Sequence, residues 1–224
     1  MDEPRIAGSL WSIPRSEQRH KAVSAARAGV HILHWDVADG TLGPVGGFGP
    51  SEAKDIARMA GVRSEAHLMV SNPLAHVDAW ATWCELVVVH IESRDWKAAL
   101  KRIAAHGVLP GIAVSPGTEL SIIPDDAQAV LIMSVEPGHA GAPFTAAAFQ
   151  RTAALRTTLT LPRMVGLDGG VKRSHAALAA QAGANWLVSG TDLFRAENMS
   201  DWVSGCTADL TPRVRSKPES LDAR

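Results

Sequence analysis

The sequence predicts an α/β protein with a (β/α)₈ barrel, or TIM barrel, fold. Short apolar runs alternate along the chain with longer amphipathic stretches. Several runs are rich in β-branched residues and lack polar alternation, which is typical of parallel strands covered on both faces. About eight such strand–helix units fit into 224 residues, near the lower size of a closed barrel.

The eight apolar runs are the expected strands of the barrel. In chain order they cover residues 6–10, 30–37, 66–70, 86–91, 108–114, 130–135, 164–167 and 185–189. The helical stretches between them include residues 17–28, 95–105, 146–155 and 174–182. Within 95–105, Trp96, Leu100 and Ile103 recur three or four residues apart and form one apolar face. Gly29, Gly61, Gly107 and Gly183 each precede a strand, as a left-handed C-cap does.

A doubly wound open sheet has the same local alternation and is the rival architecture. It would require a Gly-x-Gly-x-x-Gly turn after the first strand, and the sequence from Gly8 to Trp11 lacks one. The barrel is therefore favoured, as one domain over residues 1–204. Residues 205–224 are polar and contain Pro212 and Pro218, so we expect them to form a loosely ordered tail.

Composition excludes several classes of protein. Hydrophobic residues make up 46% and charged residues 20%, which is not typical of a disordered chain, a collagen or a coiled coil. The 22 basic and 23 acidic residues form no basic stripe, so no nucleic-acid partner is expected. Two cysteines, no signal-like segment and no apolar run of about 18 residues indicate a cytoplasmic protein without a membrane partner.

Four residues near the ends of expected strands are candidate metal ligands. His34 and Asp36 are two residues apart in one strand, so their side chains share a face. His67 and Asp168 come from the ends of two other strands, and strand ends meet at the active-site face of a barrel. Two imidazoles and two carboxylates suit Zn²⁺, Fe²⁺, Mn²⁺ or Co²⁺ equally.

A purely structural interpretation of these residues stays open. A histidine at a strand end is often a hydrogen-bonded core residue, and an aspartate before glycine is often a turn former. Asp39, before Gly40, fits the turn best. His90 and Glu92 are weaker pocket candidates, since their neighbours indicate only a core strand.

Glycines follow three successive strands and could bind a phosphate group. Glycine lets backbone N–H groups approach an anion closely, and barrels often bind phosphate after their last two strands. Tight turns also need glycine, so only the joint placement is informative. The segments are Gly138-His139-Ala140-Gly141, Gly169-Gly170 and Gly190-Thr191.

Absent features narrow the chemistry further. No lysine lies in an apolar run, which disfavours a Schiff-base aldolase, and there is no Gly-x-Ser-x-Gly nucleophile motif. Cys84 is expected to be a buried, inert thiol. Trp35 should point away from the barrel axis and pack under a helix.

Many collinear motifs between about residues 5 and 197 resemble the ribulose-phosphate 3-epimerase family. They include Ser9-Leu10, the stretch His34 to Gly40, Phe48-Gly49-Pro50, His67 to Val70, His90-Ile91-Glu92, Gly111 to Thr118, Met133 to Gly138, Asp168 to Val171 and Ser189-Gly190-Thr191. The resemblance implies a barrel of the ribulose-phosphate-binding type. It further implies one divalent metal ion per chain, bound by His34, Asp36, His67 and Asp168.

The resemblance also implies an activity, the 3-epimerisation of D-ribulose 5-phosphate to D-xylulose 5-phosphate. Asp36 and Asp168 would be the acid/base pair on opposite faces of the substrate, with a metal-stabilised enediolate between the two proton transfers. Ser9, His67, Asp168 and the three glycine segments would hold the ketose and its phosphate. We also expect a homo-oligomer.

The chain departs from the family pattern around the rim of the expected site. The differing positions are Ala38, Leu42, Val45, His139, Ala140 and Ala142. A different phosphorylated ketose, such as D-allulose 6-phosphate, is therefore an alternative substrate. A phosphosugar decarboxylase is disfavoured because Asp36 to Asp39 lacks the lysine of such enzymes. A non-catalytic phosphosugar-binding barrel is the remaining alternative, which the intact Asp36 and Asp168 argue against.

Overall fold

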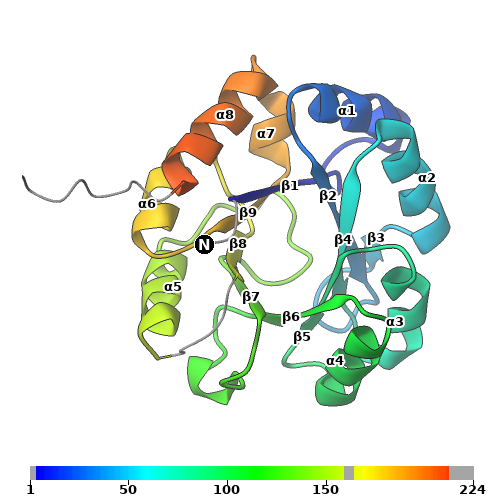
Figure 1. Cartoon of the computed structure of the whole chain (residues 1–224), viewed down its shortest axis with the longest axis vertical. Helices are drawn as coiled ribbons and strands as arrows, with labels where there is room; N and C mark the ends of the chain where they lie inside the picture. Colours follow the sequence, from blue (N-terminus) through cyan, green and yellow to red (C-terminus); the bar gives the residue numbers. More distant parts are fainter. Residues whose placement is uncertain (1–3, 159–163, 212–224) are drawn as a thin grey trace, which may run out of the picture.

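A computed structural model describes residues 4–158 and 164–211 of the chain (Figure 1). Eight parallel strands form a barrel that closes where β1 pairs with β2, and a two-residue strand, β3, adds antiparallel to β2. The strands are β1 (Arg5–Ser9), β2 (Ile32–Ala38), β3 (Gly46–Gly47), β4 (Arg63–Met69), β5 (Leu86–His90), β6 (Leu109–Val114), β7 (Ala129–Met133), β8 (Met164–Asp168) and β9 (Trp186–Ser189).

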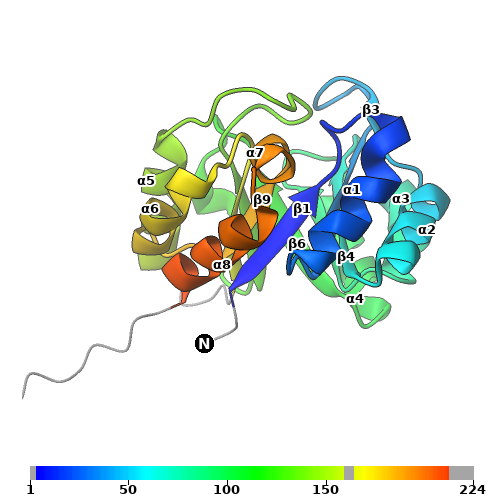
Figure 2. The same cartoon turned by 90° about the horizontal axis from the view of Figure 1, so that it is seen from above.

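The helices lie on the outside of the barrel and connect its strands, as Figures 1 and 2 show. They are α1 (Arg15–Arg27), α2 (Pro50–Ala60), α3 (Leu74–Ala81), α4 (Trp96–Ala105), α5 (Ala147–Thr158), α6 (Ala176–Gln181), α7 (Thr191–Arg195) and α8 (Met199–Leu210), with 3₁₀ turns η1 (Leu120–Ile122) and η2 (Arg173–His175). The predicted (β/α)₈ barrel is confirmed. Within the described ranges, none of the helices has both the length and the apolar character needed to span a bilayer.

Two apolar layers stabilise the barrel. One fills its interior and includes Val88, Leu131 and Trp186, and the other lies between the strands and the surrounding helices. Trp35 belongs to the outer layer, where its indole N–H donates to Ser64 Oγ at 3.0 Å. Trp35 therefore points away from the barrel axis, as the sequence predicts.

The strand register brings the candidate residues to one level at the carboxyl end of the barrel. Ser9 of β1 is paired with His34 of β2, and Asp36 of β2 with His67 of β4. Asp168 is the last residue of β8. Parallel pairing thus aligns side chains that are far apart in the sequence.

The prediction of a loosely ordered tail is wrong for residues 205–210, which are helical. Helix α8 continues to Leu210, and Cys206 and Leu210 are buried against the barrel side of the helix layer. The amide side chain of Asn198 caps α8 by accepting from the N–H groups of Ser200 and Asp201. The scattered apolar residues of this segment follow helical spacing, which the polar composition obscured. Residues 212–224 of the expected tail lie outside the described residues.

Candidate active site

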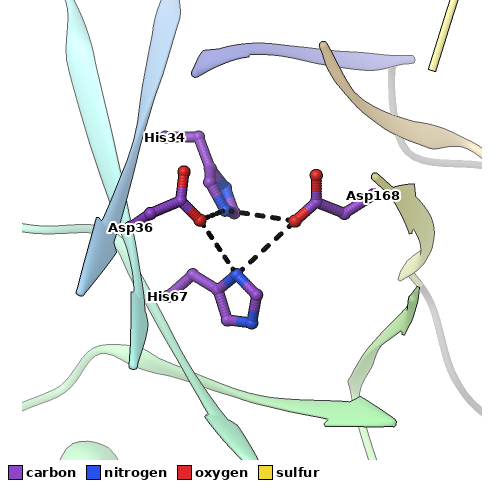
Figure 3. Close-up of side chains that lie close together, drawn as sticks. All are labelled: His34, Asp36, His67 and Asp168. Atoms are coloured by element: carbon purple, nitrogen blue, oxygen red, sulfur yellow. Dashed lines mark hydrogen bonds and ion pairs between the residues drawn. The ribbon is translucent and has the colours of Figure 1, made fainter. Parts of the chain in front are cut away.

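Four side chains converge at the carboxyl end of the barrel: His34 and Asp36 from β2, His67 from β4 and Asp168 from β8 (Figure 3). We refer to them as the His/Asp cluster. One ligand atom from each residue lies within 4.8 Å of the others. The residues predicted as metal ligands are therefore brought together.

Each histidine of the cluster faces both carboxylates. His34 Nε2 lies 3.3 Å from Asp36 Oδ1 and 3.8 Å from Asp168 Oδ2. His67 Nδ1 lies 3.2 Å from Asp36 Oδ1 and 3.5 Å from Asp168 Oδ2. The four atoms thus surround one point between β2, β4 and β8.

The other oxygen of each carboxylate is held by a hydrogen bond from outside the cluster. Ser9 Oγ donates to Asp36 Oδ2 at 2.6 Å, and the backbone N–H of Gly169 donates to Asp168 Oδ1 at 2.7 Å. These bonds fix the orientation of both carboxylates. Ser9 therefore contacts Asp36 directly, and Gly169 contacts Asp168 through its backbone N–H.

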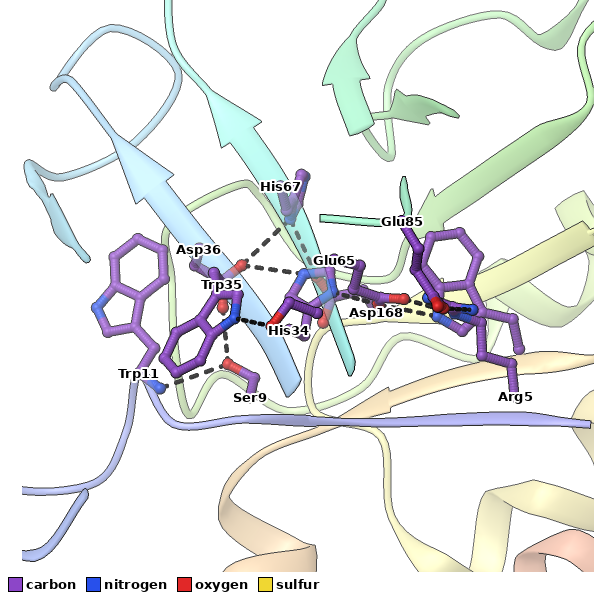
Figure 4. Close-up of polar contacts among 12 residues, drawn as sticks. Arg5, Ser9, Trp11, His34, Trp35, Asp36, Glu65, His67, Glu85 and Asp168 are labelled. Atoms are coloured by element: carbon purple, nitrogen blue, oxygen red, sulfur yellow. Dashed lines mark hydrogen bonds and ion pairs between the residues drawn. The ribbon is translucent and has the colours of Figure 1, made fainter. Parts of the chain in front are cut away.

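A buried carboxylate that the sequence analysis missed holds His34. Glu65 Oε1 lies 2.6 Å from His34 Nδ1, and Glu65 Oε2 accepts from Arg5 Nε at 2.6 Å (Figure 4). The indole N–H of Trp186 also donates to Glu65 Oε1 at 3.1 Å. A glutamate two residues before His67, inside an otherwise buried strand, was the signal that could have identified it.

His67 has its own buried partner on the side away from the carboxylates. His67 Nε2 lies 2.9 Å from His90 Nε2, and His90 Nδ1 lies 3.0 Å from Glu92 Oε2. Glu92 Oε1 accepts from the backbone N–H of Ser115 at 2.9 Å and from the Thr118 hydroxyl. The secondary candidates His90 and Glu92 therefore lie behind a cluster residue.

The cluster strongly perturbs its own titration. Burial would lower the pKa of both histidines, but neighbouring carboxylates outweigh burial and raise both pKa values. The carboxylates are Asp36 and Glu65 at His34, and Asp168 and Asp36 at His67. Burial would raise the pKa of Asp36, but the two histidines hold it well below its usual range. Burial lowers the pKa of His90, which favours its neutral form. The lowered pKa of Asp36 and the raised pKa values of the two imidazoles show that the residues of the His/Asp cluster are strongly coupled to one another.

One buried atom tests whether the cluster fits a divalent metal. His34 Nε2 is buried and makes no hydrogen bond to any described residue, although it points to two carboxylates. A buried polar atom without a hydrogen bond is costly, and ligation of a cation would satisfy it. Two imidazole nitrogens and two carboxylate oxygens suit Zn²⁺, Fe²⁺, Mn²⁺ or Co²⁺. The residues present therefore fit a metal ion, without identifying it.

A cavity of about 620 Å³ opens above the cluster. The residues of the three glycine segments line it, together with Ser9, Asp36 and Asp168. His34 and His67 are fully buried beneath its floor and do not line it. The rim position Ala142 also lines the cavity. The cavity has further lining residues that were not predicted from the sequence as site residues: Trp11, Ser12, Met69, Met133, Val135, Pro143, Val171, Lys172, Val188, Asp192, Arg195, Ala196 and Trp202.

The glycine segments shape the rim of this cavity through close backbone approaches. Gly170 has φ 61°, and a Cβ there would lie 2.5 Å from the carbonyl oxygen of Ala142. A Cβ at Gly43 would lie within 2.1 Å of the Pro137 carbonyl oxygen, so the loop after β2 touches the loop after β7. Figure 2 shows these two loops meeting at one end of the barrel. The glycines are therefore required for the rim.

Two structural interpretations from the sequence hold. Asp39 is a turn residue, accepting from the backbone N–H groups of Thr41 and Ser71 at 2.9 Å and 2.7 Å. Burial would raise its pKa, but the hydrogen bonds from Ser71 and Thr41 together outweigh burial and lower the pKa to about 2. Cys84 is buried, and burial raises its thiol pKa.

Comparison with known proteins agrees with this geometry. The chain matches the sequence model of the Ribulose-phosphate 3 epimerase family over residues 5–194. It is 33% identical to the ribulose-phosphate 3-epimerase of Aquifex aeolicus over 205 residues, which cover 87% of this chain and 89% of that protein. It is 31% identical to the cytoplasmic isoform of Oryza sativa subsp. japonica over 210 residues, covering 89% and 91% of the two chains.

Among solved structures, a 3-hexulose-6-phosphate synthase superposes with a TM-score of 0.66 over 92% of this chain and 99% of the other. Their sequences are 14% identical, so this likeness shows the shared barrel fold alone. The family match covers all eight strands of the barrel and the whole His/Asp cluster. The chain therefore belongs to the ribulose-phosphate 3-epimerase family, and it is an isomerase of the epimerase type that acts on carbohydrates.

Proposed function

We propose that this chain epimerises D-ribulose 5-phosphate and D-xylulose 5-phosphate at C3, with one divalent metal ion bound in the His/Asp cluster. One observation carries the proposal: Asp36 and Asp168 face each other across the same two imidazoles at the floor of the cavity. The names of the relatives support the same reaction.

The two carboxylates account for the proton transfers. Inversion at the carbon beside a ketone requires removal of its proton on one face and delivery of a proton on the other. Asp36 and Asp168 reach the cavity from β2 and β8, on different sides of the barrel mouth. Each would alternate between base and acid, according to the direction of the reaction. Ser9 and the Gly169 N–H would hold the two carboxylates in position.

His34, Asp36, His67 and Asp168 would hold the metal ion. When bound, the ion supplies Lewis-acid stabilisation of the negative charge that develops on the substrate oxygens. His34 and His67 lie below the floor, so they leave the space above the cluster to the substrate.

The glycine segments and nearby cations would bind the phosphate group. Residues 138–141, 169–170 and 190–191 line one side of the cavity, where backbone N–H groups can approach an anion. Lys172 and Arg195 line the same cavity and supply positive charge. The phosphate would thus lie away from the His/Asp cluster, with the reacting carbon above it.

Residues at the rim of the cavity are the reason to test a second class of phosphorylated ketose. Val45 is 78% exposed, and Ala140 and Ala142 line the cavity with small side chains. A longer phosphorylated ketose such as D-allulose 6-phosphate is the alternative that these departures favour.

The decisive test is solvent deuterium exchange at C3 across a panel of phosphorylated ketoses. Metal-loaded protein should exchange and epimerise ribulose 5-phosphate, and chelator-treated protein should do neither until metal is restored. Faster turnover of allulose 6-phosphate than of ribulose 5-phosphate would identify allulose 6-phosphate as the preferred substrate. Binding of the esters without exchange would support a non-catalytic barrel and contradict the proposal.

A further inference from the structure

The two histidines of the His/Asp cluster face it with opposite ring nitrogens. His34 turns Nε2 toward Asp36 and Asp168, whereas His67 turns Nδ1 toward the same carboxylates. A neutral imidazole can bind a cation only through the nitrogen that carries no hydrogen. The two rings therefore need opposite tautomers.

Glu65 determines the tautomer of His34. The carboxylate is ion-paired with Arg5 and fully buried, so it can only accept hydrogen bonds. Its Oε1 lies 2.6 Å from His34 Nδ1, which must carry the hydrogen of that bond. The lone pair of His34 Nε2 is thereby left facing Asp36 and Asp168. Figure 4 shows Glu65 between His34 and Arg5.

A second chain of hydrogen bonds determines the tautomer of His67. Glu92 accepts the backbone N–H of Ser115, so its carboxylate also takes the hydrogen of His90 Nδ1 at 3.0 Å. With its hydrogen on Nδ1, the His90 ring offers Nε2 as an acceptor, 2.9 Å from His67 Nε2. His67 Nε2 carries the hydrogen, and its Nδ1 is left free to face the cluster.

We propose that Glu65, and His90 together with Glu92, are positioning residues that set these opposite tautomers and so raise the affinity of the cluster for a divalent metal. The inference rests on the metal-dependent function proposed above and deepens it. The two arms end in different places, because Glu65 reaches Arg5 of β1 while Glu92 reaches the loop after β6. Loss of such a partner typically costs about 10- to 100-fold in metal affinity.

The first experiment titrates metal-free protein with Co²⁺ and follows its visible absorption, which reports both affinity and ligand geometry. Glu65→Gln should weaken Co²⁺ binding about 10- to 100-fold. Arg5 can only donate, so it would take the single amide oxygen of the glutamine and leave the amide NH₂ group facing His34 Nδ1. Glu85→Gln is the matched control, because Glu85 pairs with Arg5 but makes no contact with His34. Glu85→Gln should bind Co²⁺ like the wild type. Equal weakening in both variants would assign the effect to charge at the base of the barrel and overturn the inference for Glu65.

The second arm has a rescue test that does not depend on Glu65→Gln folding. His90→Phe removes the acceptor for His67 and should weaken Co²⁺ binding by a similar factor. His90→Gln places an amide oxygen near the position of Nε2 and should restore most of the affinity. If His90→Phe and His90→Gln bind Co²⁺ equally, His90 is not a positioning residue.

The titration separates this inference from the proposed function. If wild-type protein binds no Co²⁺, the metal-dependent function itself fails. If wild type binds Co²⁺ and Glu65→Gln and His90→Phe bind it as tightly, the function stands and the positioning role is wrong.

Discussion

At the floor of the cavity the site is made of side chains, and at the rim it is made largely of backbone. His34, Asp36, His67 and Asp168 converge from three strands, and each has a defined partner behind it. The glycine segments contribute turns with positive φ at Gly138, Gly141, Gly169 and Gly170. The floor is therefore fixed by buried hydrogen bonds, whereas the rim is fixed by close approaches that only glycine permits.

Because of this difference, the floor and the rim should tolerate amino-acid substitutions to different extents. A floor of interlocked buried residues tolerates few substitutions, because each one leaves a polar partner unsatisfied. A rim made of short loops can exchange side chains such as His139 and Ala140, which are exposed. Substitutions at the rim can therefore change substrate contacts without changing the residues of the His/Asp cluster.

The largest expected effect comes from breaking the floor. The double substitution His34→Ala with His67→Ala removes both imidazole ligands and should abolish metal binding, measured by metal analysis and titration, while circular dichroism stays unchanged. The matched control is His20→Ala with His31→Ala, since both of these histidines are exposed. Full metal content in the first variant would show that the cluster is misassigned.

The apolar interior below both regions gives the second prediction. A Cβ at Gly166 of β8 would lie 2.4 Å from the Trp186 ring and 2.8 Å from Leu131 Cδ1. Such overpacking typically costs about 1–3 kcal/mol, so Gly166→Ala should lower the free energy of unfolding by that amount. Denaturant unfolding measures it, with Gly49→Ala as control because nothing lies within 4 Å of a Cβ there. An equal loss in both variants would contradict the tight interior packing.

The rim should respond separately from the floor. Gly170→Ala forces the loop of Ala142 away, because its Cβ would lie 2.5 Å from that carbonyl oxygen. We expect KM for the phosphorylated ketose to rise about tenfold or more, with Co²⁺ affinity unchanged. Free and phosphorylated ketose should also differ strongly as substrates of the wild type. Equal turnover of the free and the phosphorylated ketose would show that the rim does not bind the phosphate group.

The smallest expected effect concerns acid stability. Hydrogen bonds from His90, Thr118 and Ser115 outweigh burial and lower the pKa of Glu92 to about 2. A carboxyl whose pKa is lower in the folded than in the unfolded chain stabilises the fold at neutral pH, and this contribution fades as pH falls from about 4.5 toward 2. The difference in unfolding free energy between wild type and Glu92→Gln should therefore become smaller as the pH is lowered from about 6 to about 3. A constant difference would contradict the account.

The sequence predicted the floor better than the rim for a physical reason. Candidate ligand residues such as His34 and Asp36 can be recognised from their side-chain types, and their two-residue spacing places them on one face of the strand. The partners Glu65 and Arg5 are ordinary residues until the β1–β2 and β2–β4 pairings bring them together. Rim contacts such as Gly43 against Pro137 join loops nearly 100 residues apart, and no local pattern reports them. The helical residues 205–210 were missed because polar composition outweighed helical spacing.

The proposed division of work between Asp36 and Asp168 is tested most directly by isotope exchange in D₂O. Asp36→Asn and Asp168→Asn are each incubated with each epimer, and label at C3 and epimer formation are followed separately. Each variant should lose roughly 10²- to 10⁴-fold in epimerisation, because it lacks one positioned proton donor or acceptor. Exchange from one epimer should survive better in Asp36→Asn, and exchange from the other in Asp168→Asn. Epimerisation at the wild-type rate in either variant would contradict the two-carboxylate mechanism.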